Sequence, residues 1–133
     1  MNKQIEKTFA EKGGIFRLIP IFVPRRFSKP GHRLRLHPDD YYALGTKRGA
    51  IKERWFSSVI RCMNGPEAAE DEGLSYVSYG NTPAERFTLK EAVQTLKGAL
   101  IGEELYQKHG TWPMYSKFFD YEEPLFHHVH LDF

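Results

Sequence analysis

Residues 125–131 read LFHHVHL, a short apolar segment that predicts a β-strand with two histidines on one face. Successive side chains of a strand point to opposite faces, so His128 and His130 should point the same way and His127 the other way. Neutral imidazole is the commonest protein ligand for zinc and related divalent metals. We therefore predict that His128 and His130 are metal ligands.

Two histidines make only part of a catalytic metal site, which usually has three protein ligands and one open position. Nothing in the sequence places another histidine beside His128 and His130. The alternative is that this end of the chain is a solvated tail or the remnant of an affinity tag. A tag is disfavoured because Val129 interrupts the histidines and apolar residues flank them.

Two runs in this part of the chain resemble a known family. Residues 117–120 read KFFD and residues 124–130 read PLFHHVH. Together with the stretch that begins at Trp112, they resemble the metal-site region of type I phosphomannose isomerases (mannose-6-phosphate isomerases) in the cupin superfamily. In that family a lysine-hydrophobic-hydrophobic-aspartate run precedes a strand that reads leucine-x-x-glutamine-valine-histidine. Here His128 stands at the glutamine position, and Leu131 stands where a proline usually follows the histidine.

The resemblance implies a cupin fold, a jelly roll of two packed β-sheets with the metal inside the barrel. It implies zinc as the cofactor and His128 and His130 as two of its ligands. The other ligands and the catalytic base are then expected beyond residue 133, which would make the chain the N-terminal part of a longer cupin-type protein. The implied activity is aldose–ketose isomerisation of a sugar or sugar phosphate, in which the metal polarises the substrate's oxygens while a base moves a proton between adjacent carbons.

A second hypothesis is a non-catalytic cupin-like module that binds a carbohydrate or a protein partner through exposed aromatic rings. Aromatic side chains offer stacking area to such ligands, although they more often fill hydrophobic cores. A glutamate shortly after residue 133 in the parent gene would favour the isomerase. The candidate aromatic residues are Tyr41, Tyr42, Trp55, Trp112 and Tyr115.

The composition is that of one globular domain spanning residues 1–133, because 41% of the residues are hydrophobic and 14% are aromatic. There is no apolar run long enough to cross a membrane, and the polar N-terminus does not resemble a signal peptide. The single cysteine, Cys62, excludes an intramolecular disulfide and is expected to be a small buried side chain. We therefore expect a cytoplasmic protein with no membrane partner.

The net charge of +2 hides two halves of opposite sign. Residues 1–61 contain 14 Lys/Arg and 5 Asp/Glu, whereas residues 62–133 contain 5 and 12. The favoured interpretation is that these charges are solvated or pair with each other within the fold. A small phosphorylated ligand is the next alternative, and nucleic acid is disfavoured. We expect a small sugar or sugar phosphate as the partner, and the oligomeric state is left open.

Periodicity predicts several short strands. Residues 1–12 are polar and are expected to form a flexible tail or a short frayed helix. The stretch 15–23 is apolar and β-branched but contains Pro20, which predicts an edge strand or a strand that bends. Alternation of polar and apolar residues predicts further strands at 32–37, 54–60 and 74–79.

One amphipathic helix is predicted near residues 88–109. Thr88 followed by Glu91 is a capping box, in which each side chain bonds the other residue's backbone N–H. Apolar residues then recur at helical spacing, Gly98 and Gly102 should weaken or bend the helix, and Gly110 should end it. The fold class is therefore mainly β (α+β), with an incomplete cupin-like β-sandwich or jelly roll and one helix.

Overall fold

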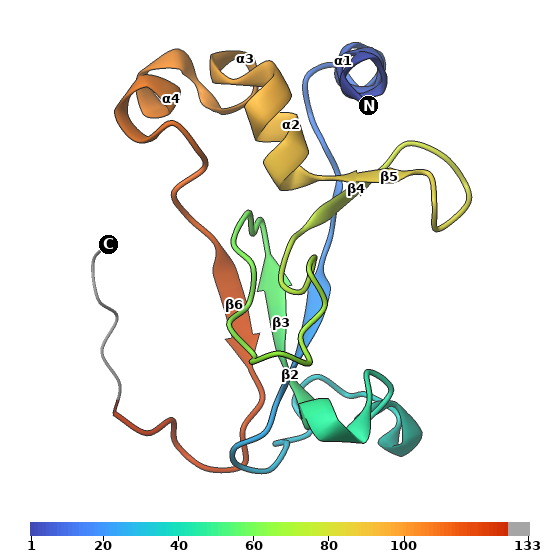
Figure 1. Ribbon diagram of the computed structural model, residues 1–133, viewed down its shortest axis with the longest axis vertical. Helices are drawn as coiled ribbons and strands as arrows, with labels where there is room; N and C mark the ends of the chain where they lie inside the picture. The colour runs from blue at the N-terminus through green and yellow to red at the C-terminus, as the bar shows by residue number, and fades with distance from the viewer. Residues whose placement is uncertain (128–133) are drawn as a thin grey trace.

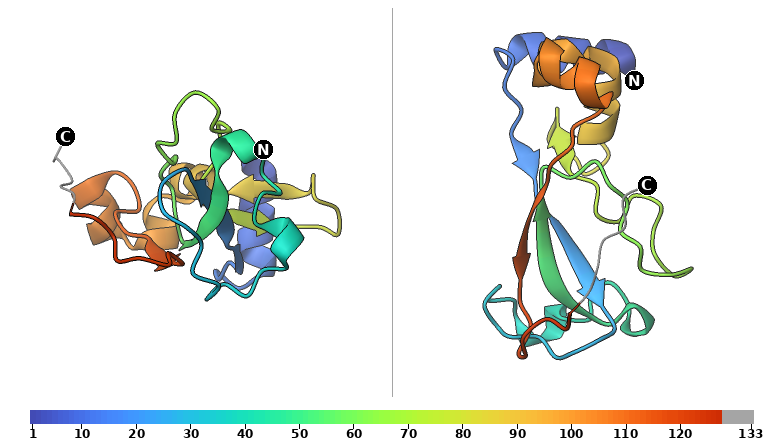
Figure 2. Two further views of the ribbon diagram at one scale, coloured as in Figure 1. Left: turned by 90° about the horizontal axis from the view of Figure 1, so that it is seen from below. Right: turned by 90° about the vertical axis from the view of Figure 1, so that its left-hand side faces the viewer.

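The computed structural model describes residues 1–127 and shows an α+β fold with its α-helices gathered at one end (Figures 1 and 2). The described chain also contains two small antiparallel sheets, each of three strands. No helix among these residues is long and apolar enough to span a membrane. The elements in chain order are α1 (Asn2–Glu11), β1 (Leu18–Ile19), β2 (Ile21–Arg25), the 3-10 turns η1 (Pro38–Asp40) and η2 (Thr46–Arg48), β3 (Ala50–Phe56), β4 (Tyr76–Ser78), β5 (Arg86–Thr88), α2 (Leu89–Leu96), α3 (Gly98–Ile101), α4 (Glu103–His109) and β6 (Ser116–Phe119).

Pro20 divides the first predicted strand between the two sheets. β1 pairs with β4 in the sheet β1-β4-β5, whereas β2 pairs with β3 in the sheet β2-β3-β6. Proline cannot donate a ladder hydrogen bond, so the chain changes sheets at this residue. The predicted bend is confirmed. The strand predicted at 74–79 is also present as β4, while the one predicted at 54–60 begins and ends earlier, as β3.

The N-terminal segment is a helix, one of the two alternatives that the sequence left open beside a flexible tail. α1 turns Ile5 and Thr8 inward, and both are buried. Ile5 belongs to a core cluster that joins α1 to β4, β5 and α2 through Val77, Phe87 and Ala92. Tertiary packing of Ile5, and of Phe9 against Phe16 at 5.7 Å between ring centres, therefore holds a short helix that is otherwise mostly polar.

The predicted helix near 88–109 is three short helices. The capping box at its start is confirmed, since the Thr88 Oγ1 accepts from the Glu91 N–H at 3.1 Å and the Glu91 carboxylate accepts from the Thr88 N–H at 2.8 Å. The helix breaks at Lys97, where φ is 51°, and again at Gly102, where φ is 90°. Gly110 ends α4 in the left-handed conformation, as predicted.

The strand predicted at residues 32–37 is absent, and these residues form a loop. The backbone N–H groups of Arg33 and Leu34 donate to the fully buried carboxylate of Asp120, at 2.7 and 3.0 Å. His32 and Arg35 have positive φ, which a regular strand does not allow. The carboxylate of Asp120 thus accepts the N–H hydrogen bonds that a neighbouring strand would accept in a sheet.

The two oppositely charged halves of the sequence meet inside the fold. Arg48 forms an ion pair with the buried Glu72, and Lys29 lies 3.8 Å from Glu122 at the surface. The predicted internal pairing is confirmed for these residues.

Candidate functional site

The sheet β2-β3-β6 carries the charged residues of the candidate site on one face. In the ladder Val23 lies opposite Glu53, which lies opposite Phe119, while Trp55 lies opposite Lys117. Residues two apart on one strand share a face, so Glu53, Trp55, Lys117 and Phe119 project to the same side. The sheet thereby brings together residues that are far apart in the sequence.

Arg25 lies on the same face, because it follows Val23 by two residues on β2. The ladder between β2 and β3 shifts register between Val23 and Pro24. The extra residue of this β-bulge is Lys52 on β3, and proline in a strand is tolerated at such a position. The guanidinium of Arg25 forms a bidentate ion pair with the carboxylate of Glu53. Its Nε donates to Oε1 at 2.8 Å and its Nη2 donates to Oε2 at 3.1 Å.

Glu53 is 2% exposed and accepts hydrogen bonds from three side chains. Besides Arg25, the Trp55 Nε1–H donates to it at 2.7 Å and the Tyr121 hydroxyl donates to Oε1. Burial alone would raise the pKa of the Glu53 carboxyl, but the bonds from Arg25, Tyr121 and Trp55 outweigh it and lower that pKa. Burial and the bond to Glu53 both raise the pKa of Tyr121. The Glu53 carboxylate is therefore ionised at neutral pH, and both of its oxygens accept hydrogen bonds from neighbouring side chains.

Lys117 is the one charged side chain of this group that lacks an ion pair within residues 1–127. Its ammonium group lies 4.2 Å from the centre of the Trp55 ring, 4.9 Å from that of Tyr115 and 5.6 Å from that of Phe119. Aromatic faces attract a cation without neutralising its charge. Because Arg25 and Glu53 cancel each other, Lys117 supplies the excess positive charge of the site.

A cavity of about 240 Å³ opens beside these groups. Phe27 stacks on Tyr121 at 5.4 Å between ring centres, and Phe126 meets Phe27 edge-on at 5.0 Å, so aromatic rings wall one side. The segment after β6 turns back to close another side. The lining combines the polar residues Arg25, Glu53, Lys117 and Tyr121 with the apolar residues Phe27, Phe119, Leu125 and Phe126.

The predicted metal ligands His128 and His130 lie outside the described residues. Of the strand predicted at 125–131, the described part, residues 125–127, is irregular chain, and His127 is exposed. The other histidines lie elsewhere: the His32 ring bonds the Tyr41 hydroxyl at 2.9 Å, His37 caps η1, and His109 ends α4. Within residues 1–127 no three His, Cys, Asp or Glu side chains are grouped so that they could hold a metal.

The aromatic residues of the second hypothesis do not form one exposed surface in the described chain. Tyr41 and Trp55 are buried, at 5% and 3% exposure, and Tyr42 is exposed on a different part of the fold. Cys62 is buried as expected, and burial raises the pKa of its thiol. It lies in the small core beneath Trp55.

Arg25, Glu53 and Tyr121 were not identified as site residues from the sequence, because the hydrogen bonds of Glu53 to Arg25 and Tyr121 span 28 and 68 positions of the chain. One local signal was available. In β3, Glu53 lies between Ile51 and Trp55 at period two, so a carboxylate occupies the core-facing side of the strand. A charge at such a position requires a buried partner.

Comparison of the chain with protein-family models, with curated proteins and with solved structures finds no match.

Proposed function

We propose that this protein binds a sugar phosphate in the cavity beside β6. In this proposal it acts as a metal-dependent aldose–ketose isomerase of the mannose-6-phosphate isomerase type and has a cupin-like fold. The observation that carries the proposal is Lys117, an ammonium group with no ion pair within residues 1–127, at the edge of a cavity walled by aromatic rings. Lysine is a common phosphate ligand that acts as a point charge.

The cavity suits a small polar ligand that has an apolar face. Its volume of about 240 Å³ is below the range typical of drug-sized ligands. Phe119 and Phe126, 41% and 59% exposed, offer ring faces to the C–H side of a sugar. We assign the phosphate to Lys117 and the sugar ring to these two phenylalanines.

The occupied carboxylate of Glu53 has a positioning role in this proposal. All of its described hydrogen bonds come from Arg25, Trp55 and Tyr121, so it holds these side chains in place rather than taking a proton from a substrate. Arg25 is fixed further by the Asn64 side chain at 2.9 Å. The network thus provides a rigid wall against which Lys117 can receive an anion.

For the metal, we propose zinc and retain His128 and His130 as ligands on the strength of their spacing and of the family resemblance. They begin two residues beyond Phe126, which lines the cavity. Because no metal site is present within residues 1–127, no step of the chemistry is assigned to the metal.

Trp55 provides the readout that tests this function. Its ring lies 4.2 Å from the Lys117 ammonium group, so a ligand at Lys117 should change tryptophan fluorescence. Titration with mannose 6-phosphate, mannose and inorganic phosphate should give saturable binding that is strongest for the phosphorylated sugar. Equal responses to mannose and mannose 6-phosphate, or no saturable response to either, would contradict the proposal.

A further inference from the structure

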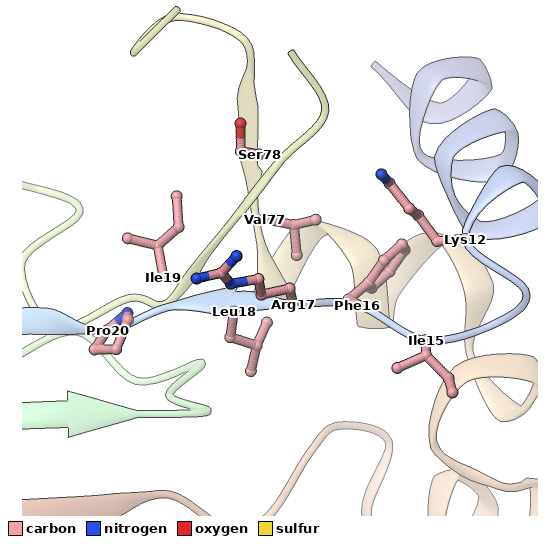
Figure 3. A pocket seen from close by; sticks show the side chains of 9 residues that line it. All are labelled: Lys12, Ile15, Phe16, Arg17, Leu18, Ile19, Pro20, Val77 and Ser78. Atoms are coloured by element: carbon pink, nitrogen blue, oxygen red, sulfur yellow. The ribbon is translucent and has the colours of Figure 1, made fainter. Parts of the chain in front are cut away.

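A cavity of about 570 Å³ lies on the other sheet, beside β1 (Figure 3). Phe16, Leu18 and Val77 contribute its innermost apolar surface, since Val77 is buried and the other two are partly buried. Ile15 and Ile19, 77% and 39% exposed, extend the apolar lining to the solvent. A cavity with this lining favours an aliphatic or aromatic ligand.

Two cations flank this apolar lining. Lys12 lies at the end of α1, and Arg17 lies just before β1. In Figure 3 the side chains of Phe16 and Val77 lie between the Lys12 ammonium group and the Arg17 guanidinium group. No ion pair of Lys12 or Arg17 is found within residues 1–127. Glu11, which precedes Lys12 in the sequence, lies 3.8 Å from Lys7.

We propose that this cavity binds an anionic amphiphile with a single aliphatic chain, of the fatty-acid class. The alkyl chain lies over Phe16, Leu18 and Val77. The carboxylate binds the cation at one end of this path, Lys12 or Arg17, because the apolar side chains separate the two cations. Burial of the chain provides most of the binding free energy, since each methylene group removed from water adds to it. The two cations add selectivity for an anion over a neutral molecule of the same length.

An extended acidic peptide is the competing occupant of an exposed strand edge. Such a peptide binds by adding backbone hydrogen bonds to the free edge of a sheet. β1 is only two residues long, so it offers little backbone for this purpose. The apolar lining of the cavity and the shortness of the strand both favour the small amphiphile.

Calorimetric titration of the whole chain with decanoate, below its micellar concentration, tests the proposal. We expect one decanoate per chain, at least tenfold weaker binding of 1-decanol, and no detectable binding of acetate. Amide NMR shifts should be concentrated at residues 12–20 and 77–78. Equal affinity for decanoate and decanol, binding without saturation, or shifts confined to other residues would overturn the assignment.

The double variant Lys12→Gln/Arg17→Gln should bind decanoate at least tenfold more weakly. Both side chains are exposed, so the melting temperature should not change. Lys90→Gln, which removes an exposed lysine on α2, is the matched control and should bind as the wild type does. Unchanged decanoate affinity in the double variant would contradict the site. So would tight binding of an acidic, leucine-containing peptide with none of decanoate, which would assign the surface to a protein partner.

Discussion

Arg25 and Glu53 form a two-point ion pair in the interior of the protein, with Nε–Oε1 and Nη2–Oε2 distances of 2.8 and 3.1 Å. Their side chains are only 13% and 3% exposed. A charge that loses its partner in such a setting remains buried and uncompensated, which is far more costly than the loss of a surface ion pair. This pair therefore sets the stability of the wall of the candidate site.

Glu53→Gln should lower the free energy of unfolding by about 3–5 kcal/mol, because it leaves the Arg25 guanidinium without its counter-charge. Urea unfolding at pH 7 measures this change. The control is Glu122→Gln, which removes the exposed Lys29–Glu122 pair and should cost less than about 0.5 kcal/mol. Similar losses in the two variants would show that the buried pair has no special role.

Tyr121→Phe provides a milder test, with an expected loss of about 1–3 kcal/mol in the free energy of unfolding, because it removes the hydroxyl that donates to Glu53.

The lowered pKa of the Glu53 carboxyl predicts how the free energy of unfolding depends on pH. The pKa of Glu53 is lower in the folded protein than the value of about 4.3 expected for an unfolded glutamate. As the pH falls, Glu53 therefore binds a proton in the unfolded chain before it does so in the folded protein. Its stabilisation is complete above about pH 4.3 and is lost as the pH falls through the folded pKa. The difference in unfolding free energy between the wild type and Glu53→Gln should shrink below about pH 4.3. A difference that stays constant with pH would refute this.

Thr88→Ala should destabilise the fold by about 1 kcal/mol, because the first turn of α2 loses the acceptor for the Glu91 N–H. Thermal and urea unfolding would both detect this change. Thr46→Ala is the matched control, since Thr46 is exposed and no hydrogen bond of its hydroxyl is present within residues 1–127. Equal melting temperatures for the two variants would show that the cap contributes nothing.

The metal proposal predicts modest zinc binding by the 133-residue chain, because two imidazoles without a third ligand form an incomplete site. Affinity measured by calorimetry should fall as the histidines become protonated near pH 6.5. His128→Ala and His130→Ala should each abolish this binding, while His109→Ala, at the end of α4, should leave it unchanged. Zinc binding that survives in the double variant His128→Ala/His130→Ala would exclude these residues as ligands.

The features that could be predicted from the sequence depend on residues close together in the chain. The capping box needs only Thr88 and Glu91, the change of sheet needs only Pro20, and the helix end needs only Gly110. The α+β class follows from such local patterns. They cannot specify which distant group will satisfy a backbone hydrogen bond.

The errors arose where a distant partner decides the local structure. Residues 32–37 alternate like a strand, but Asp120 takes the N–H groups of Arg33 and Leu34. For the N-terminal segment the sequence left a flexible tail and a short helix open, and the packing of Ile5 on Val77 and Phe87 explains the helix. The cluster around Glu53 was missed for the same reason, since its contacts to Arg25 and Tyr121 exist only once β2, β3 and the chain after β6 have come together.

The most direct measurement of the proposed function is the affinity of mannose 6-phosphate for the wild type and for Lys117→Met, determined by calorimetry. One charge-assisted contact contributes about 1.5–3 kcal/mol, so the variant should bind about ten- to a hundredfold more weakly. Lys90→Met, on the exposed face of α2, should bind as the wild type does. Equal affinities of the wild type and Lys117→Met would contradict the assignment of the phosphate to Lys117 and, with it, the sugar-phosphate site beside β6.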